Sequence, residues 1–270
     1  MSKIAFIGGG NMSSCIFDGI RKTRSTQDEI TVSGPHLEKL RKFEQQSATI
    51  TTDNVKAATE AEVIFLGVKP QMLTSVLEEL AAAKVDLTQK LVISMAAGFR
   101  LASLNRLTHS ERLVRIMPNT PAKLGLGITG IFFGGKVGEA DRSLSLALLE
   151  GLGTTLILKS EEEINLIGSV AGSAPAFMYR FMEALIAESV RYGMTEADAR
   201  KVIEQMALGT ASMVIHNQDT PLAALREAVT SRGGTTFEGL KVMTEYRFEE
   251  MMEKVIAATL KRTHEFEELF

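Results

Sequence analysis

The start of the chain constrains its fold more than any other stretch. Lys3–Ile7 is a short, strand-like apolar run that leads into Gly8-Gly9-Gly10-Asn11-Met12-Ser13 and then into a helical pattern ending near Arg21. This order is typical of a dinucleotide-binding unit, because the glycines let the backbone approach a pyrophosphate at the helix N-terminus. Ser13 replaces the usual third glycine or alanine and still permits close helix–strand packing. The alternative is a tight strand–helix turn without a ligand.

Short apolar runs and helical patterns alternate over residues 1–160. This alternation predicts an α/β fold with a doubly wound, mostly parallel, Rossmann-like sheet, whose ligands lie beyond the carboxyl ends of the strands. Three small or polar segments fall at that edge: Val68-Lys69-Pro70, Ala96-Ala97-Gly98 and Asn119-Thr120-Pro121. The alternative is that their prolines and glycines simply end the strands. Further strands are expected at Glu29–Ser33, Thr49–Thr51, Val63–Val68, Leu91–Ser94, Leu113–Ile116, Gly127–Phe133 and Thr154–Leu158, with helices from Asn54, over Met72–Ala83 and over Glu139–Glu150.

The end of the second strand bears on the choice of coenzyme. An NAD-specific fold usually places an acidic residue about twenty residues after the glycine motif, on the ribose hydroxyl. This chain has Ser33-Gly34-Pro35-His36 there. Ser33 is therefore a candidate donor to a ribose phosphate, and His36 or Lys39 is a candidate source of positive charge. NADPH is favoured over NADH, whose use stays open because no arginine is adjacent.

The pattern changes to helices after the sheet region. From Glu161 the apolar residues recur at helical spacing, and Pro175 is expected to kink or restart the first long helix. Thr195 and Pro221 mark the starts of further helices, and a last helix is expected from Thr235 toward Phe270. We therefore predict two domains, 1–160 and 161–270. The apolar stripe of the second, rich in methionine, favours homo-oligomerisation.

A second glycine-containing segment lies in the helical region, at Val229-Thr230-Ser231-Arg232-Gly233-Gly234-Thr235-Thr236. Two glycines followed by threonines and an apolar periodic run are typical of a turn that opens a helix. Successive N–H groups at a helix N-terminus suit a small anion, and a carboxylate fits. The alternative is a helix–helix turn whose hydroxyls only cap.

Composition excludes several classes of protein. Lys+Arg 30 against Asp+Glu 33 gives a net charge of −3, which leaves no basic field for nucleic acid. The single cysteine, Cys15, cannot form an internal disulfide, and the chain opens on a strand-like run and not on a signal-like segment. No run approaches the roughly 18 apolar residues of a membrane helix. We expect a soluble, cytoplasmic protein.

Taken together, these motifs resemble those of the pyrroline-5-carboxylate reductase family, which acts in proline biosynthesis. The resemblance covers essentially the whole chain and is most specific at Val229–Thr236. The other segments that carry it are Phe6–Met12, Gly67–Gln71, Ser94–Gly98 and Met117–Pro121. One departure is Ala171-Gly172-Ser173-Ala174-Pro175-Ala176, where the family usually has Ser-Gly-Ser-Gly-Pro-Ala.

The resemblance implies a role for individual residues. NADPH is expected on Ile7, Gly8, Gly9, Gly10, Asn11, Met12, Ser33, Asn54, Val68, Lys69 and Ala97. The substrate is expected on Ser231, Gly233, Gly234, Thr235, Thr236 and Glu161, with the Thr236 hydroxyl near the ring nitrogen. The resemblance also implies an intimate homodimer through the helical domain, able to assemble further, with each site between one subunit's cofactor domain and the partner's helices.

The implied reaction is reduction of a cyclic imine to L-proline by hydride transfer. A protonated iminium is already electrophilic, so the rate is expected to come mainly from proximity and from carboxylate anchoring, with Thr236 orienting or donating to the nitrogen. None of the four histidines, His36, His109, His216 and His264, is paired by spacing with an acid or a metal-ligand partner. No metal is expected.

Two other functions stay open. A β-hydroxyacid dehydrogenase-like enzyme, or another imine reductase, also combines these domain types, but such dehydrogenases use a lysine on the first long interdomain helix and Ile164–Tyr179 contains none. A non-catalytic NADPH-binding protein is the third candidate. It would have no reason to keep the anion loop at Gly233–Thr236.

Overall fold

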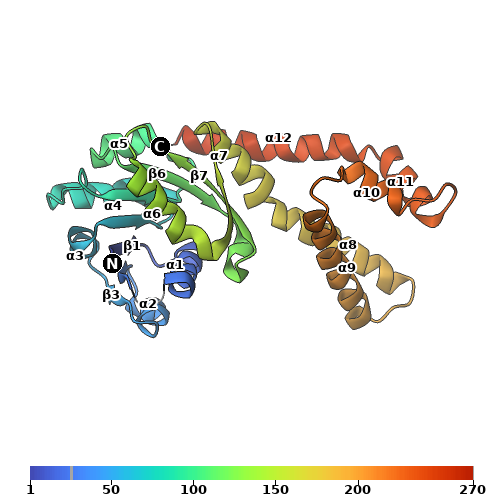
Figure 1. The fold of residues 1–270 in the computed structure, drawn as a ribbon, viewed down its shortest axis with the longest axis horizontal. Coiled ribbons are helices and arrows are strands. Elements are labelled where there is room, and N and C mark those ends of the chain that lie inside the picture. Colours follow the sequence, from blue (N-terminus) through green and yellow to red (C-terminus); the bar gives the residue numbers. More distant parts are fainter. Residues whose placement is uncertain (25–26, 270) are drawn as a thin grey trace. The chain divides into compact units, whose positions relative to one another are not determined.

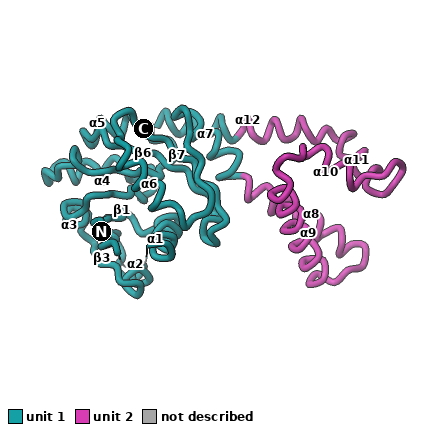
Figure 2. The backbone as a smooth tube through the Cα atoms, viewed as in Figure 1, with its two compact units in different colours: residues 1–173, 259–270 teal, residues 174–258 magenta. Residues whose placement is uncertain are grey.

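The computed structural model describes residues 1–24 and 27–269. The chain divides into two compact units (Figure 2). The first comprises Met1–Ser173 together with the segment from Thr259 onward, and the second comprises Ala174–Ala258. The division differs from the expected boundary at residue 160 in two ways, because the start of the helical region and the end of the last helix both belong to the first unit.

The first unit is built on a sheet (Figure 1). Its strand order is β3-β2-β1-β4-β5-β6-β7-β8. Neighbouring strands are parallel except for the antiparallel pair β6 and β7. This confirms the expected doubly wound, mostly parallel sheet. The strands are β1 Lys3–Ile7, β2 Glu29–Ser33, β3 Thr49–Thr51, β4 Val63–Leu66, β5 Leu91–Ser94, β6 Leu113–Pro118, β7 Gly127–Phe133 and β8 Gly153–Ile157.

Helices cover both faces of the sheet, and the alternation of side chains along each strand supplies both cores. In β1, Ile4 and Phe6 join the core under α1, α2 and α6, while Ala5 and Ile7 join the core under α3, α4 and α5. Phe6 stacks on Phe65 of β4 with ring centroids 4.7 Å apart. The helices are α1 Asn11–Arg24, α2 Leu37–Glu44, α3 Asn54–Glu60, α4 Pro70–Ala82, α5 Leu101–Thr108, α6 Glu139–Leu149 and α7 Glu162–Ile167, with short 3₁₀ turns η1 Thr120–Leu124 and η2 Glu150–Leu152.

Pro175 restarts the helix in which it lies, as expected. After α7 the chain forms a π-helical turn, η3 Gly168–Gly172, in which the Ser173 N–H donates to the Gly168 carbonyl at 2.9 Å. Helix α8 then begins at Ala174, which is also the start of the second unit. Pro175 lies in its first turn, where a proline is tolerated although it has no N–H for the helical hydrogen bonds. The remaining helices are α8 Ala174–Arg191, α9 Glu196–His216, α10 Leu222–Ala228, α11 Thr235–Glu245 and α12 Phe248–Glu267, of which α12 passes into the first unit at Thr259.

Three expected helix boundaries were wrong. The last helix is two helices, because Arg247 adopts a left-handed conformation with φ +53° that ends α11 before α12 begins. Pro221 lies before α10 as its N-cap and not at its first position. α4 begins at Pro70 and not at Met72, since proline is favoured at the first helical position.

A buried ion pair joins α1 to the start of β2. Arg24 Nε lies 2.6 Å from Asp28 Oδ2, the Ser2 N–H donates to Asp28 Oδ1 at 2.9 Å, and the Asp28 side chain has 0% exposure. Burial by itself raises the pKa of Asp28, but the hydrogen bonds from Arg24 and Ser2 outweigh it and hold the pKa below its ordinary value. Asp28 therefore stabilises the fold fully at pH values above the ordinary pKa of an aspartate. This stabilisation is lost as the pH falls from that value through the lowered pKa of Asp28 in the folded protein.

We expect Asp28→Asn to lower the free energy of unfolding at pH 7 by about 1–3 kcal/mol, because Arg24 loses a charged partner. The variant should also lose stability less steeply than the wild type on acidification. Denaturant unfolding at a series of pH values measures both effects. Glu111→Gln is the matched control, since it removes an exposed pair with Lys136. If the free energy of unfolding fell equally with decreasing pH in the wild type and in Asp28→Asn, the lowered pKa of Asp28 would be contradicted.

Candidate active site

The carboxyl ends of four strands meet at one edge of the sheet. The Gly8 N–H donates to the Ser33 carbonyl at 3.0 Å, and the Gly67 N–H donates to the Ile7 carbonyl at 2.9 Å. The Met95 N–H reaches the Leu66 carbonyl at 3.4 Å. The glycine turn after β1, the end of β2, and the turns after β4 and β5 are thus adjacent, as the strand pattern predicts.

The first position of the motif must be glycine, because the backbone of the turn after β4 lies directly against it. Gly8 has φ +104°, and a Cβ there would lie 2.7 Å from both Gly67 C and Val68 N. Ser13 is buried and donates its hydroxyl to the Gly8 carbonyl at 2.6 Å. This confirms that serine permits close helix–strand packing at the third small position. Gly10 and Asn11 are exposed at the start of α1, which leaves the helix N-terminus accessible within this unit.

Ser33 and Asn54, both predicted cofactor residues, are in direct contact. The buried Ser33 hydroxyl lies 2.8 Å from Asn54 Oδ1, and Asn54 Nδ2 donates to Glu79 Oε2 of α4 at 3.0 Å. Glu79 is a residue that the sequence interpretation missed, because nothing in its spacing links a mid-helix acid to the end of β2. His36, the N-cap of α2, and Lys39 are exposed.

The turns after β4 and β5 hold the remaining cofactor candidates. Lys69 is exposed and lies at the N-cap of α4, while Val68 is half-buried beside Gly8. Ala97 is half-buried in the turn after β5. All the predicted cofactor residues therefore come from this edge of the first unit.

Glu161 lies in the first unit, where its carboxylate already has two partners. Its Oε1 accepts from Arg115 Nη1 at 2.7 Å and from the Leu101 N–H at 2.6 Å. The Arg115 side chain, on β6, is 2% exposed, and its Nη2 has no hydrogen-bond partner among the residues that the structure describes. Glu161 thus neutralises a buried guanidinium and caps the N-terminus of α5, and its predicted contact with substrate stays a prediction. The sequence interpretation missed Arg115, whose position within an apolar strand marks it as a buried charge.

The remaining substrate candidates lie together in the second unit, at the start of α11. The Gly234 N–H donates to the Ser231 carbonyl at 2.9 Å, and Gly233 has φ +71°, so these residues form a tight turn that needs glycine. The helix begins at Thr235 with Gly234 as N-cap, and this glycine has no side chain with which to cap it. Thr235 and Thr236 are exposed. Since the first N–H groups of a helix have no intrahelical partners, this turn has the chemistry of an anion site.

None of the described helices has the length and apolar character that a membrane-crossing segment needs.

Comparison with known families supports both halves of this description. Residues 3–98 match a family of NADP oxidoreductases described as coenzyme F420-dependent. Residues 161–266 match the family described as pyrroline-5-carboxylate reductase dimerisation. The two matches cover the sheet edge with its glycine turn and the helical region with the Gly233–Thr236 turn.

Full-length relatives agree with these matches. The chain is 43% identical over 270 residues to a pyrroline-5-carboxylate reductase of Vibrio alginolyticus, covering 99% of this chain and 98% of the relative. A solved pyrroline-5-carboxylate reductase of Coxiella burnetii is 33% identical with a TM-score of 0.89, covering 98% of each chain. The fold is also similar to that of a Plasmodium falciparum pyrroline carboxylate reductase solved with NADP bound, which is 24% identical with a TM-score of 0.86 over 98% of each chain.

Proposed function

Because this chain belongs to the pyrroline-5-carboxylate reductase family, we propose that it reduces L-1-pyrroline-5-carboxylate to L-proline, the final step of proline biosynthesis. The reaction transfers a hydride from a nicotinamide coenzyme to the carbon of the cyclic imine. The observation that carries the proposal is the full-length similarity to pyrroline-5-carboxylate reductases. The start of α11, whose N-cap is a glycine, and the glycine turn after β1 supply the two binding chemistries that the reaction needs.

The proposed coenzyme is NADPH, which supplies the hydride. The backbone from Ile7 to Met12 binds the pyrophosphate, because the turn around Gly8 excludes side chains and leaves the N-terminus of α1 accessible. Ser33 and Asn54 form the ribose end of the site, and Val68, Lys69 and Ala97 line the rest. The end of β2 carries no carboxylate that would repel a ribose phosphate.

The substrate is anchored by its carboxylate on the turn that opens α11. The N–H groups after Gly233 and Gly234 bind the carboxylate, and the side chains of Ser231, Thr235 and Thr236 surround it. The Thr236 hydroxyl orients the ring nitrogen or donates to it. These residues raise the rate by fixing the imine carbon relative to the coenzyme.

The second unit is proposed to form a homodimer through its helices. Among the described residues, α8, α10, α11 and α12 bury no side chain fully within one chain, and α9 buries Ala199 and Ile203. Large apolar side chains are exposed instead, among them Met178, Tyr179, Phe181, Val190, Met206, Leu208, Met213, Ile215, Phe237, Val242 and Met251. So much exposed apolar surface is unusual for a monomer and favours a second copy as its partner.

We expect the purified protein to oxidise NADPH in the presence of pyrroline-5-carboxylate, faster than it oxidises NADH, because no acidic residue at the end of β2 opposes the ribose phosphate. Loss of reduced-nicotinamide absorbance, followed in parallel with the two coenzymes, measures both rates. Equal or faster decay with NADH would overturn the coenzyme assignment. NADPH binding without turnover of this imine would overturn the reaction, and hydroxy acids and other cyclic imines would then separate the two enzymatic alternatives.

A further inference from the structure

The turn between β5 and α5, residues Met95–Arg100, is covered by the last turn of α12. Gly98 has φ +80°, and a Cβ there would lie 3.0 Å from the Phe266 carbonyl oxygen and 3.1 Å from Phe266 Cβ. The backbone of the C-terminal helix therefore rests directly on this turn. Ala97, the residue proposed to lie beside the coenzyme, directly precedes Gly98 in the chain.

A charged cluster fastens the helix to the turn. Arg100 Nη2 lies 2.6 Å from Glu267 Oε2 and 2.8 Å from Glu162 Oε2. The buried Asn165 bridges the same two carboxylates, its Nδ2 lying 3.0 Å from Glu267 Oε1 and 3.2 Å from Glu162 Oε1. The Glu267 side chain is 9% exposed. Because the cluster joins the end of α12, the start of α7 and the last residue of the turn, it holds three segments distant in sequence.

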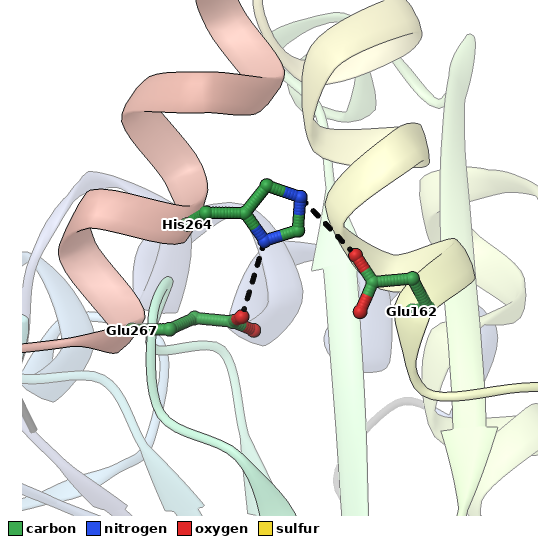
Figure 3. A group of neighbouring side chains, drawn as sticks. All are labelled: Glu162, His264 and Glu267. Atoms are coloured by element: carbon green, nitrogen blue, oxygen red, sulfur yellow. Dashed lines mark ion pairs between the residues drawn. The ribbon is translucent and has the colours of Figure 1, made fainter.

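His264 lies between the same two carboxylates. Its Nε2 is 3.4 Å from Glu162 Oε1, and its Nδ1 is 3.5 Å from Glu267 Oε2 (Figure 3). The sequence interpretation that no histidine is paired by spacing with an acid was wrong for His264, because Glu267 lies three residues later on the same helix. These three residues are of the types that ligate metals. Arg100, however, already places a positive charge against both carboxylates, so we interpret the cluster as a set of ion pairs that links α7, α12 and the Met95–Arg100 turn.

A second contact holds the residue that directly follows the turn. The Leu101 N–H, which opens α5, donates to Glu161, and Glu161 is held by the buried Arg115. The turn is therefore clamped by the start of α7, through Glu161 and Glu162, and by the end of α12, through Glu267 and the Phe266 backbone. Loss of the Glu267 contact would leave Arg100 paired with Glu162 alone and would loosen the α12 clamp on Gly98, while the Glu161 contact remained.

We propose that Glu267 is a positioning residue for hydride transfer, acting through Arg100 and the Met95–Arg100 turn. The proposal rests on the proposed function, because it requires a nicotinamide beside Ala97. Hydride transfer is sensitive to geometry, and a displacement of about 1 Å at a distance from the chemistry lowers the rate by about a hundred-fold. A partial release of one clamp is expected to lower turnover by about ten-fold.

The test compares Glu267→Ala and Glu267→Gln with Glu265→Ala. Glu265 lies on the same helix and pairs with Arg262 at 2.6 Å on an exposed face, so its loss removes an ion pair without releasing the turn. Each variant is assayed well below its melting temperature for turnover, for NADPH affinity by coenzyme fluorescence, and for the kinetic isotope effect with deuterated NADPH. Hydrogen exchange of the peptide that covers Met95–Arg100 is measured without substrate.

We expect Glu267→Ala to reduce turnover about ten-fold, to raise the isotope effect because the chemical step becomes slower, and to speed exchange in the turn. Glu267→Gln should fall between it and the wild type, and Glu265→Ala should match the wild type. A folded Glu267→Ala protein with unchanged isotope effect and exchange would overturn the proposal, as would equal losses in Glu265→Ala. If Glu267→Ala does not fold, Glu267→Gln decides by the same readouts. An inactive wild type would overturn the proposed function instead, while the exchange measurement would still report on the clamp.

Discussion

Replacing Thr236 with alanine is expected to lower turnover of pyrroline-5-carboxylate by about ten-fold or more, because the variant loses the hydroxyl proposed to orient or protonate the ring nitrogen. Thr236 is exposed in the first turn of α11, and the backbone N–H groups proposed to anchor the carboxylate remain in the variant. Substrate binding should therefore fall less than turnover does. NADPH binding should stay largely intact, since the glycine turn after β1 belongs to the other compact unit.

Two further variants make this result interpretable. Thr236→Ser keeps a hydroxyl and should recover much of the turnover. Thr244→Ala removes a hydroxyl from the same helix, where it donates to the Leu240 carbonyl at 3.1 Å, and should behave like the wild type. Steady-state rates with NADPH, together with coenzyme affinity from fluorescence, separate the two steps. Unchanged turnover in Thr236→Ala would remove this threonine from the mechanism.

Replacing Glu161 with alanine is expected to lower the free energy of unfolding by about 3–5 kcal/mol, because it leaves the buried Arg115 guanidinium without its counter-charge. Arg115 Nη1 loses its contact with Glu161, Nη2 already has no partner within the described part of the chain, and the Leu101 N–H loses its cap. A loss of this size is a large part of the stability of a typical domain. Denaturant unfolding of the wild type and variant measures it.

A second substitution separates the buried charge from other effects. Adding Arg115→Met to Glu161→Ala removes the orphaned guanidinium and should recover part of the lost stability. Glu162→Ala is the matched control on the neighbouring residue, since Arg100 keeps its contact with Glu267. A change below about 1 kcal/mol in Glu161→Ala would show that water or another group solvates Arg115, contrary to the geometry.

Local patterns predicted most of the fold. The alternation in strands such as Lys3–Ile7 identified the sheet, and the strand order identified the edge at which the glycine turn meets the ends of β2 and β4. Helical spacing after Glu161 identified the second region. These predictions succeeded because burial on a strand or helix face leaves a periodic trace in the sequence. The break at Arg247 left no such trace, since arginine has no particular preference for the left-handed conformation that ends α11.

The long-range contacts of the site were beyond the sequence interpretation. Arg100 and Glu267 are 167 positions apart, and Arg115 and Glu161 are 46 apart. Either pair is only two ordinary charged residues until the fold brings them together. Glu79, which contacts Asn54, is likewise one of many exposed helical acids. The motifs therefore predict where the coenzyme and substrate bind, and they do not predict the contacts that hold the surrounding segments in place.

The return of α12 to the first unit sets an order of completion during protein synthesis. A ribosome makes the whole sheet, with its glycine turn, well before it makes the segment from Thr259 to Glu267 that covers Gly98 and pairs with Arg100. Domains generally fold as units during translation, the N-terminal one first. Here the domain that is encoded first is completed last, so a nascent chain that already contains every coenzyme-binding motif still has an unfinished coenzyme domain.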